Sequence, residues 1–346
     1  PTKVAVAMSG GVDSSVTAWL LQQQGYEVIG VHMRLGVDNG ESKERVGLIA
    51  EKLNLPLYVF DISSEFREQV IDYFIHSYEQ GITPNPCIRC NNLIKFHTIL
   101  KKAKEVGCSL LATGHYARIR SQKEGYALTE AEDKSKDQSY FLYNLDQERL
   151  SHLLFPLGEH TKKEVARLAR EQGLDIGQKE SQDICFIGKD HNEFLKGYLQ
   201  PEKGEIRDKQ GNILGQHAGM AFYTLGQRRG LDLGGDGPYY VAYRDRDNNI
   251  IYVSTDKDDP WLYHRSIEVN RMHWIKGEPE EKEFVCQGKV RYNMKKKECR
   301  VKKEKDNWTV EFTHPIRAIA EGQSLVLYEY EEVLGGGEIS GLGEIG

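Results

Sequence analysis

The chain has 346 residues, which is long enough for two or three domains that each bury a hydrophobic core. With 39% hydrophobic and 28% charged residues, its composition is that of an ordinary globular protein and excludes a largely disordered chain. The formal net charge of −6 argues against a protein that coats nucleic acid indiscriminately, although a local basic surface can still bind a folded RNA.

No stretch approaches the roughly 18 consecutive apolar residues of a membrane span, and the first eight residues lack an export pattern. The sequence therefore predicts a cytoplasmic protein without a membrane partner. Six cysteines are too few for a disulfide scaffold, so the closely spaced ones are interpreted as catalytic or metal-binding. Cys108, Cys286 and Cys299 have no such neighbours and are predicted to be buried small hydrophobes or incidental thiols.

The first half of the chain alternates between strand-like and helix-like patterns. Apolar residues spaced three and four apart, such as Val16, Trp19 and Leu20, predict the helices. Short apolar runs predict strands at residues 3–8, 27–33, 57–60 and 109–112. This alternation predicts an α/β fold with a doubly wound, mostly parallel sheet covered on both faces. Residues 81–92, with two prolines and two cysteines, are predicted to form a functional loop.

From about residue 199 the helical patterns become scarce and glycine turns recur. Strands are predicted at residues 239–243, 250–253, 284–290, 308–312 and 324–328. The sequence thus predicts three domains, which are a catalytic α/β domain at 1–196, a small β-rich connector at 197–260 and a C-terminal β-barrel at 261–346.

The segment SGGVDSS at residues 9–15 lies between a predicted strand and a predicted helix. Its flexible backbone, N–H groups and hydroxyls at the positive end of a helix are suited to pyrophosphate. The segment lacks the lysine of the Walker sequence, which favours a grip on the β,γ-pyrophosphate over γ-phosphate transfer. An ordinary capped glycine turn is the alternative. Asp13 is predicted to be involved with Mg²⁺, and helix capping is its alternative role.

SGGVDSS is similar to the signature of the ATP-pyrophosphatase, or PP-loop, superfamily, whose members activate a substrate oxygen by attaching AMP. Further motifs follow in order: TPNPCIRCN (83–91), IKF (94–96), ATGHYAR (112–118), KDQSY (136–140), SQDICF (181–186), YTLGQRRG (223–230) and LGGG (334–337). Together they resemble the tRNA-specific 2-thiouridylases of the MnmA/TrmU family over nearly the whole chain. A lone glycine loop is weak evidence, whereas this ordered series is specific.

The resemblance implies a tRNA-uridine 2-sulfurtransferase. It adenylates the wobble uridine at C2, because a carbonyl oxygen leaves poorly and AMP leaves readily, and sulfur transfer then yields 2-thiouridine. By the family mechanism Cys185 carries a persulfide, and Cys90 resolves the remaining link as a disulfide. Arg89 and the nearby helix terminus are expected to lower the thiol pKa. Two unrelated thiols are the alternative for this pair.

Cys87 departs from the family pattern, in which many relatives carry an aspartate. Cys87, Cys90 and Cys185 together supply three thiolates, a set able to hold a [4Fe-4S] cluster with one iron open to sulfide. A persulfide route without metal is an alternative. A structural zinc site is another, although zinc would want a fourth protein ligand.

The resemblance also implies contacts with ATP and with tRNA. The ATP contacts are Ala7, Met8, Ser9, Gly10, Gly11, Val12, Asp13, Ser14, Ser15, Met33 and Gly114. The tRNA contacts are Asn85, Pro86, Cys87, His115, Lys136, Asp137, Gln138, Arg291, Tyr292 and Gln323. Alternatives are a core role for Met33 and His115, a simple turn for Gly114, a turn that only positions the cysteines for Asn85 and Pro86, and a solvated hairpin for the basic run at 291–303. Gln323 departs from the family in its context, since EGQ replaces the usual PGQ.

The implied partners are the anticodon arm of tRNA and a sulfur donor, which is a cysteine desulfurase, a sulfur-relay protein or free sulfide. Two other functions stay open from sequence. One is a different adenylating PP-loop enzyme, which needs no cysteine pair. The other is a non-catalytic tRNA-binding protein or sulfur carrier.

Overall fold

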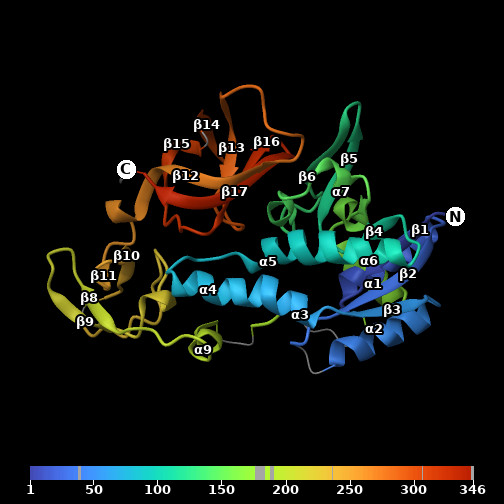
Figure 1. The fold of residues 1–346 in the computed structure, drawn as a ribbon, viewed down its shortest axis with the longest axis horizontal. Helices are drawn as coiled ribbons and strands as arrows, with labels where there is room; N and C mark the ends of the chain where they lie inside the picture. Colours follow the sequence, from blue (N-terminus) through green and yellow to red (C-terminus); the bar gives the residue numbers. More distant parts are fainter. Residues whose placement is uncertain (38–39, 176–183, 188–190, 236, 306, 344–346) are drawn as a thin grey trace.

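The structure is a computed structural model that describes residues 1–37, 40–175, 184–187, 191–235, 237–305 and 307–343. An α/β unit contains the N-terminus, a small sheet lies at the opposite end of the molecule, and a C-terminal barrel lies above the helices that run between them (Figure 1). In the described part of the chain, no helix combines the length and the apolar character that crossing a membrane requires.

The α/β unit is built on a parallel sheet with the strand order β3-β2-β1-β4-β7. Its strands are β1 (Lys3–Ala7), β2 (Glu27–Arg34), β3 (Leu57–Asp61), β4 (Leu110–Ala112) and β7 (Leu153–Leu154). Alternate residues of β1 point to opposite faces. Val4 and Val6 join one hydrophobic core, and Ala5 and Ala7 join another. The predicted doubly wound parallel sheet is confirmed.

Helices cover both faces of this sheet. One core contains side chains of α1 (Val12–Gln23), α2 (Glu41–Lys52) and α8 (Lys162–Glu171). The other core contains Phe66, Phe74 and Ile94 from two longer helical stretches. The first stretch comprises α3 (Ser63–Phe66), a π-type segment (Arg67–Asp72) and α4 (Tyr73–Glu79). The second comprises α5 (Pro86–Arg89), a π-type segment (Cys90–Ile99) and α6 (Leu100–Glu105).

The second helical stretch corrects the loop predicted for residues 81–92, because the helix already begins at Pro86. The Asn85 side chain accepts a hydrogen bond from the Ile88 N–H at 3.3 Å and so caps the helix. Proline is tolerated in a first turn, where its missing N–H has no helical partner. Cys87 and Cys90 therefore lie on a helix, not on a loop.

Shorter elements connect the α/β unit to the rest of the molecule. They are β5 (Ala117–Gln122), β6 (Gly125–Glu130), α7 (Gln147–Leu150), α9 (His191–Lys196) and 3₁₀ turns at Ser139–Leu142 and Pro156–Glu159. The β5–β6 hairpin extends the sheet of the C-terminal barrel, since Thr129 pairs with Glu332 of β17. This hairpin was not among the elements predicted from the sequence.

The small sheet at the far end has the order β10-β11-β8-β9. Its strands are β8 (Gly204–Arg207), β9 (Ile213–His217), β10 (Tyr240–Asp245) and β11 (Ile250–Ser254), with 3₁₀ turns at Met220–Phe222 and Pro260–Leu262. β10 and β11 overlap the predicted strands at 239–243 and 250–253.

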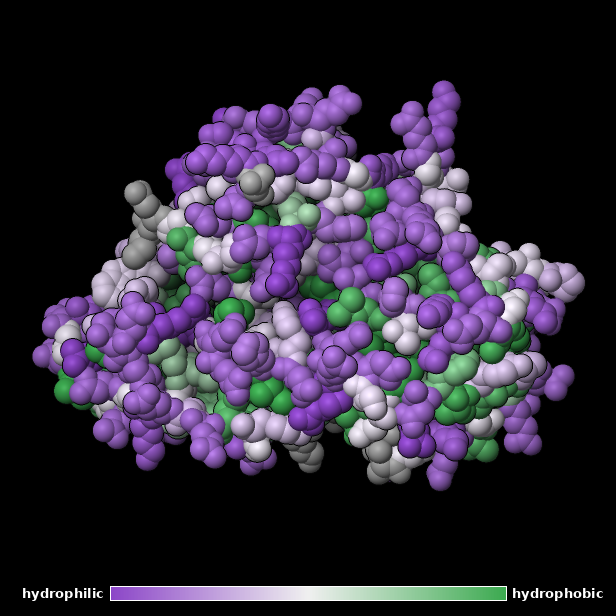
Figure 2. All heavy atoms as spheres, viewed as in Figure 1, coloured by the Kyte–Doolittle hydropathy of each residue, from purple (hydrophilic) through white to green (hydrophobic). Residues whose placement is uncertain are grey.

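The C-terminal barrel consists of six antiparallel strands, closed by pairing of the first with the last. They are β12 (Tyr263–Trp274), β13 (Glu283–Lys289), β14 (Lys297–Glu304), β15 (Asn307–Arg317), β16 (Ser324–Glu329) and β17 (Glu332–Leu342). Val301, Val310, Phe312 and Leu325 fill its interior. Hydrophilic side chains dominate the visible surface of the barrel (Figure 2), so its apolar residues are used inside. The predicted barrel is confirmed.

Candidate active site

The glycine loop follows β1 and leads directly into α1. Gly10 has φ +80°, and a Cβ there would lie 3.2 Å from the Ser42 carbonyl oxygen, so a side chain is doubly unfavourable. The Ser14 and Ser15 hydroxyls donate to the Gly11 carbonyl at 3.0 and 2.9 Å. Gly11 provides no side-chain cap for α1. The first-turn N–H groups of α1 are thus suited to an anion.

Asp13 lies at the positive end of α1 and has two side-chain partners. Lys162 Nζ lies 2.6 Å from Asp13 Oδ1, and the Tyr116 hydroxyl donates to the same oxygen at 3.0 Å. Lys162 begins α8 directly after Thr161, which forms a capping box with Glu164. The capping signal locates the start of the helix but does not reveal which loop it faces.

Gly114 follows β4 and lies against the glycine loop itself. A Cβ at Gly114 would lie 3.0 to 3.1 Å from Asp13 and from the Ser14 nitrogen, so this approach requires glycine. His115, the next residue, is buried, and its Nδ1 lies 2.7 Å from the Thr113 hydroxyl oxygen. Its ring also contacts Phe96 of the cysteine-bearing helix, with centroids 5.6 Å apart. Residues 113–116 therefore connect the glycine loop to that helix.

Three cysteines meet beside this connection. Burial raises the pKa of the Cys90 thiol to about 12, Lys95 opposes the rise, and the thiols of Cys185 and Cys87 add to it. Burial likewise raises the pKa of Cys185, again opposed by Lys95. The thiols of Cys87 and Cys185 both lie close enough to affect Cys90, although almost a hundred residues separate Cys90 from Cys185 in the sequence.

The expectation of lowered thiol pKa values is wrong, because burial outweighs the nearby positive charge. Arg89, expected to supply that charge, points elsewhere. Its Nε donates to the Gln69 carbonyl at 2.5 Å, and its guanidinium lies 4.1 Å from the centre of the Tyr73 ring. The positive charge near the thiols comes from Lys95 instead. Its Nζ donates to Asn91 Oδ1 at 2.9 Å. The sequence analysis quoted Lys95 within IKF but assigned it no role.

Replacing Lys95 with methionine is expected to slow alkylation of Cys185 by iodoacetamide about fivefold at pH 8. Only the thiolate reacts, and loss of the positive charge raises the thiol pKa further. In the unmodified protein the rate should still climb above pH 8, because both thiols are mainly protonated there. Lys101→Met, on the exposed side of the same helix, is the control. Equal alkylation rates in the Lys95 and Lys101 variants would show that Lys95 does not lower the pKa of the Cys185 thiol.

Cys185 is held by its neighbour in the sequence. Phe186 makes edge-to-face contacts with Phe66, Phe74 and Phe194, at centroid distances of 5.9, 5.3 and 5.5 Å. The Cys185 residue as a whole is exposed, although enough protein surrounds its thiol to raise the thiol pKa. The first three residues of the SQDICF motif, 181–183, lie outside the described residues. An anchored phenylalanine thus presents an exposed cysteine to the helix that carries Cys87 and Cys90.

Cys87, Cys90 and Cys185 do not surround a common point as the ligands of one metal ion would. Within the described ranges, which include all three cysteines, no three His, Cys, Asp or Glu side chains are arranged to hold one metal ion. The three thiols therefore do not form a zinc site in this conformation, whereas a [4Fe-4S] cluster would bind each thiolate at a different iron. Cys108, Cys286 and Cys299 are buried, as predicted, with Cys286 Sγ and Cys299 Sγ 4.0 Å apart inside the barrel.

The residues expected to contact ATP or the target base have varied environments. Met33, at the end of β2, is partly buried and packs against the larger core. Asn85 is the helix cap, and Pro86 is buried behind it. The capping role agrees with the alternative, in which these two residues position the cysteines, and their contact with the base stays a prediction.

The predicted tRNA-binding segment at 136–138 divides into exposed and buried side chains. Lys136 is exposed. Asp137 is buried, and its carboxylate accepts from the Ala131 N–H at 2.9 Å and the Ser139 hydroxyl at 2.8 Å. Gln138 Oε1 accepts from the Tyr116 N–H at 3.0 Å. Two of the three side chains therefore hold this loop in place.

The predicted tRNA contacts on the barrel also have protein partners. Tyr292 packs on Phe141 of the α/β unit with ring centroids 4.6 Å apart, and the exposed Arg291 donates to the Arg317 carbonyl at 2.9 Å. Gln323 Nε2 donates to the Thr83 carbonyl at 3.0 Å.

Much of the basic run is paired with acidic side chains. The ion pairs are Lys296–Glu130 at 3.0 Å, Arg300–Glu283 at 2.9 Å, Lys302–Glu304 at 2.7 Å and Lys303–Glu278 at 2.5 Å. This pairing fits the solvated hairpin better than a concentrated phosphate-binding patch.

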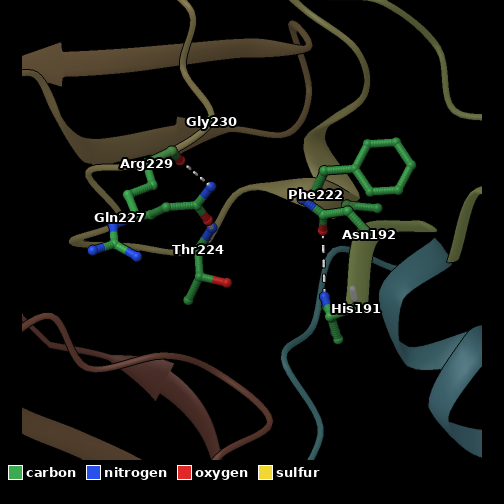
Figure 3. A pocket seen from close by; sticks show the side chains of 8 residues that line it. His191, Asn192, Phe222, Thr224, Gln227, Arg229 and Gly230 are labelled. Atoms are coloured by element: carbon green, nitrogen blue, oxygen red, sulfur yellow. Dashed lines mark hydrogen bonds between the residues drawn. The ribbon is translucent and has the colours of Figure 1, made fainter. Parts of the chain in front are cut away.

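A pocket of about 300 Å³ lies between α9 and the YTLGQRRG segment. Figure 3 shows Thr224, Gln227 and Arg229 on one side and His191 on the other, with Gln227 Nε2 donating to the Arg229 carbonyl at 2.9 Å. None of its lining residues was predicted as a catalytic, ATP-binding or tRNA-binding residue.

Comparison with known proteins yields matches along nearly the whole chain. Residues 2–189 match the tRNA methyl transferase HUP domain, 192–255 the tRNA methyl transferase PRC-barrel domain and 264–339 the aminomethyltransferase beta-barrel domain. The chain is 41% identical to tRNA-specific 2-thiouridylase MnmA 2 of Aliarcobacter butzleri, with 98% of each chain covered. It is 42% identical to MnmA of Pediococcus pentosaceus, covering 98% of this chain and 95% of that one. It is 43% identical to MnmA 1 of Caldanaerobacter subterraneus, covering 97% of each.

Proposed function

This chain belongs to the MnmA family of tRNA-specific 2-thiouridylases, and we propose that it is itself such an enzyme. It adenylates the wobble uridine of tRNA at C2 and replaces the C2 oxygen with sulfur, and the products are 2-thiouridine, AMP and pyrophosphate. One observation carries the proposal: residues 113–116 connect a pyrophosphate-type glycine loop to a helix whose cysteines interact with Cys185. Activation and sulfur transfer can therefore occur at one edge of the sheet.

ATP binding is assigned to the glycine loop, with Met33 and Gly114 as further contacts. The N–H groups of the first turn of α1 hold the pyrophosphate portion, and Lys162 adds positive charge beside them. Asp13 fits Mg²⁺, because this ion is commonly held by one or two carboxylates together with substrate phosphates. When bound, Mg²⁺ would neutralise phosphate charge as pyrophosphate leaves. Lys162 and Tyr116 orient the Asp13 carboxylate meanwhile.

For the sulfur, we propose a persulfide on Cys185, resolved by Cys90. The terminal sulfur attacks the activated carbon, AMP leaves, and the Cys90 thiolate then attacks Cys185 Sγ. The C2-linked sulfur departs as the new thiocarbonyl, and a Cys90–Cys185 disulfide remains. A reductant must reopen this disulfide before the next turnover. The high thiol pKa values protect both cysteines until a substrate changes their environment.

The [4Fe-4S] alternative makes a different prediction, since Cys87 would then be a ligand together with Cys90 and Cys185. Iron and acid-labile sulfide should be measured in protein purified without oxygen. We expect colourless, iron-free protein that thiolates tRNA at full rate. Brown protein whose activity depends on bound iron would replace the persulfide route with the cluster route.

The partners follow from this chemistry. The segments 197–260 and 261–346 would hold the anticodon arm against the catalytic unit at 1–196, with His115, Lys136, Arg291 and Tyr292 near the RNA. The persulfide sulfur would come from a cysteine desulfurase or a relay protein, whose own persulfide passes its outer sulfur to the Cys185 thiolate and leaves a thiolate behind. Free sulfide lacks this oxidised sulfur and would serve the cluster route. A cytoplasmic location is proposed, where ATP and tRNA are both available.

Nucleoside mass spectrometry provides the direct test. Unmodified tRNA is incubated with the protein, ATP, Mg²⁺, a reductant and a cysteine desulfurase with its cysteine substrate, and the digest is examined for 2-thiouridine. We expect 2-thiouridine together with equal amounts of AMP and pyrophosphate. AMP release without sulfur incorporation would indicate a different adenylating enzyme. Tight tRNA binding without AMP release would indicate a non-catalytic binding protein.

A further inference from the structure

The C-terminal barrel binds the segment that precedes the helix carrying Cys87 and Cys90. This segment, residues 81–84, runs from the end of α4 to the Asn85 cap of the helix that carries Cys87 and Cys90. The Thr83 N–H donates to the Glu321 carbonyl at 3.0 Å. In return, Gln323 Nε2 donates to the carbonyls of Thr83 and Pro84 at 3.0 and 3.4 Å. The barrel thus binds the backbone of the segment through both donors and acceptors.

Gly322, between those two barrel residues, makes the approach possible. Its φ is +87°, and a Cβ there would lie 2.1 Å from Ile82 Cγ2 and 2.9 Å from the Thr83 carbonyl oxygen. Any side chain at 322 would therefore push the segment away from the barrel. The contact is close-packed, so the barrel and the segment must move together.

The small sheet contributes a third partner to the same point. Arg246, in the turn between β10 and β11, forms an ion pair with the Glu321 carboxylate and donates to the Gly81 carbonyl at 3.2 Å. Burial lowers the pKa of the neighbouring Arg244 to about 10, Arg246 lowers it further, and Glu321 opposes both effects. The Glu321 carboxylate therefore balances the positive charges of two arginines.

We propose that Glu321 and Arg246 are positioning residues for sulfur transfer. Their ion pair and hydrogen bonds hold the barrel and the small sheet against residues 81–84. When those two units bind tRNA, they therefore also fix the positions of Cys87 and Cys90. Pro84 is three residues before Cys87, and a displacement of the segment passes directly into the first helical turn. This inference rests on the proposed function, since it concerns the same cysteines.

The test uses the full-length variants Glu321→Gln and Arg246→Gln in single-turnover thiolation at saturating tRNA and ATP. Each is expected to react about fivefold more slowly, in line with the loss of one partly buried ion pair. The affinity for tRNA and the melting temperature should stay at wild-type values. The conservative variant Glu321→Asp, which keeps a carboxylate facing Arg244 and Arg246, should retain most of the rate, which a general structural defect would not allow.

The control is Glu283→Gln, which removes an ion pair of the same barrel, 2.9 Å from Arg300 and distant in sequence from residues 81–84. It should react at the wild-type rate. Gln variants as fast as wild type, or Glu321→Asp no faster than Glu321→Gln, would overturn the inference. If wild-type protein itself formed no 2-thiouridine, the proposed function would fail instead, so the two failures can be told apart.

Discussion

Replacing Cys185 with serine is expected to lower the yield of 2-thiouridine per turnover at least about a thousandfold, while release of pyrophosphate continues. A hydroxyl cannot carry a persulfide, whereas the glycine loop and Asp13 remain intact. Cys90→Ser should block a later step of the reaction. The persulfide still forms on Cys185, but without the Cys90 thiolate the disulfide link between Cys185 and the modified base is not cleaved. Mass spectrometry of the intact protein under non-reducing conditions should then detect a Cys185-linked tRNA adduct.

The matched control is Cys108→Ala, which removes a buried cysteine that has no predicted part in the reaction. Its loss should change stability by about 1 kcal/mol at most and leave the thiolation rate near wild type. If Cys185→Ser still produced 2-thiouridine, the persulfide route would be wrong. If it lost pyrophosphate release as well, Cys185 would be needed for ATP binding, contrary to its assigned role.

The second large effect is expected at Lys162. Lys162→Met should lower kcat/KM for ATP about thirtyfold, because it removes the cationic partner that lies 2.6 Å from Asp13 and a positive charge beside the glycine loop. Without this lysine, the Asp13 carboxylate would repel the phosphates of incoming nucleotide. The loss should appear in pyrophosphate release measured across a range of ATP concentrations.

Lys163→Met is the control, since this neighbour on α8 is exposed and has the same charge. We expect it to behave as wild type. Lys162→Arg should retain most of the activity, because the charge is kept while the geometry changes. Equal kcat/KM values in the two methionine variants would show that the Lys162–Asp13 ion pair has no part in nucleotide use.

Several parts of the site were predictable because their signals are local. The glycine loop, its flanking strand and helix, and the capping box at Thr161 depend on residues within one or two turns of each other. The assignment of Cys87, Cys90 and Cys185 to one site came from the resemblance, and their electrostatic interaction agrees with it. The start of the catalytic helix was missed because two prolines and two cysteines outweighed the capping signal of Asn85.

The sequence by itself determined the parallel sheet and the barrel, because strand and helix periodicity depends on neighbouring positions. The resemblance of its motifs supplied the residues that are predicted to carry the chemistry. Only the tertiary structure decided which charged side chains lie near the site. Arg89 points away from the thiols, and Lys95 lies near them. Lys162 pairs with Asp13, and Glu321 contacts residues 81–84. Such contacts depend on which face of each helix is buried and on how distant segments pack, and these are properties of the whole fold.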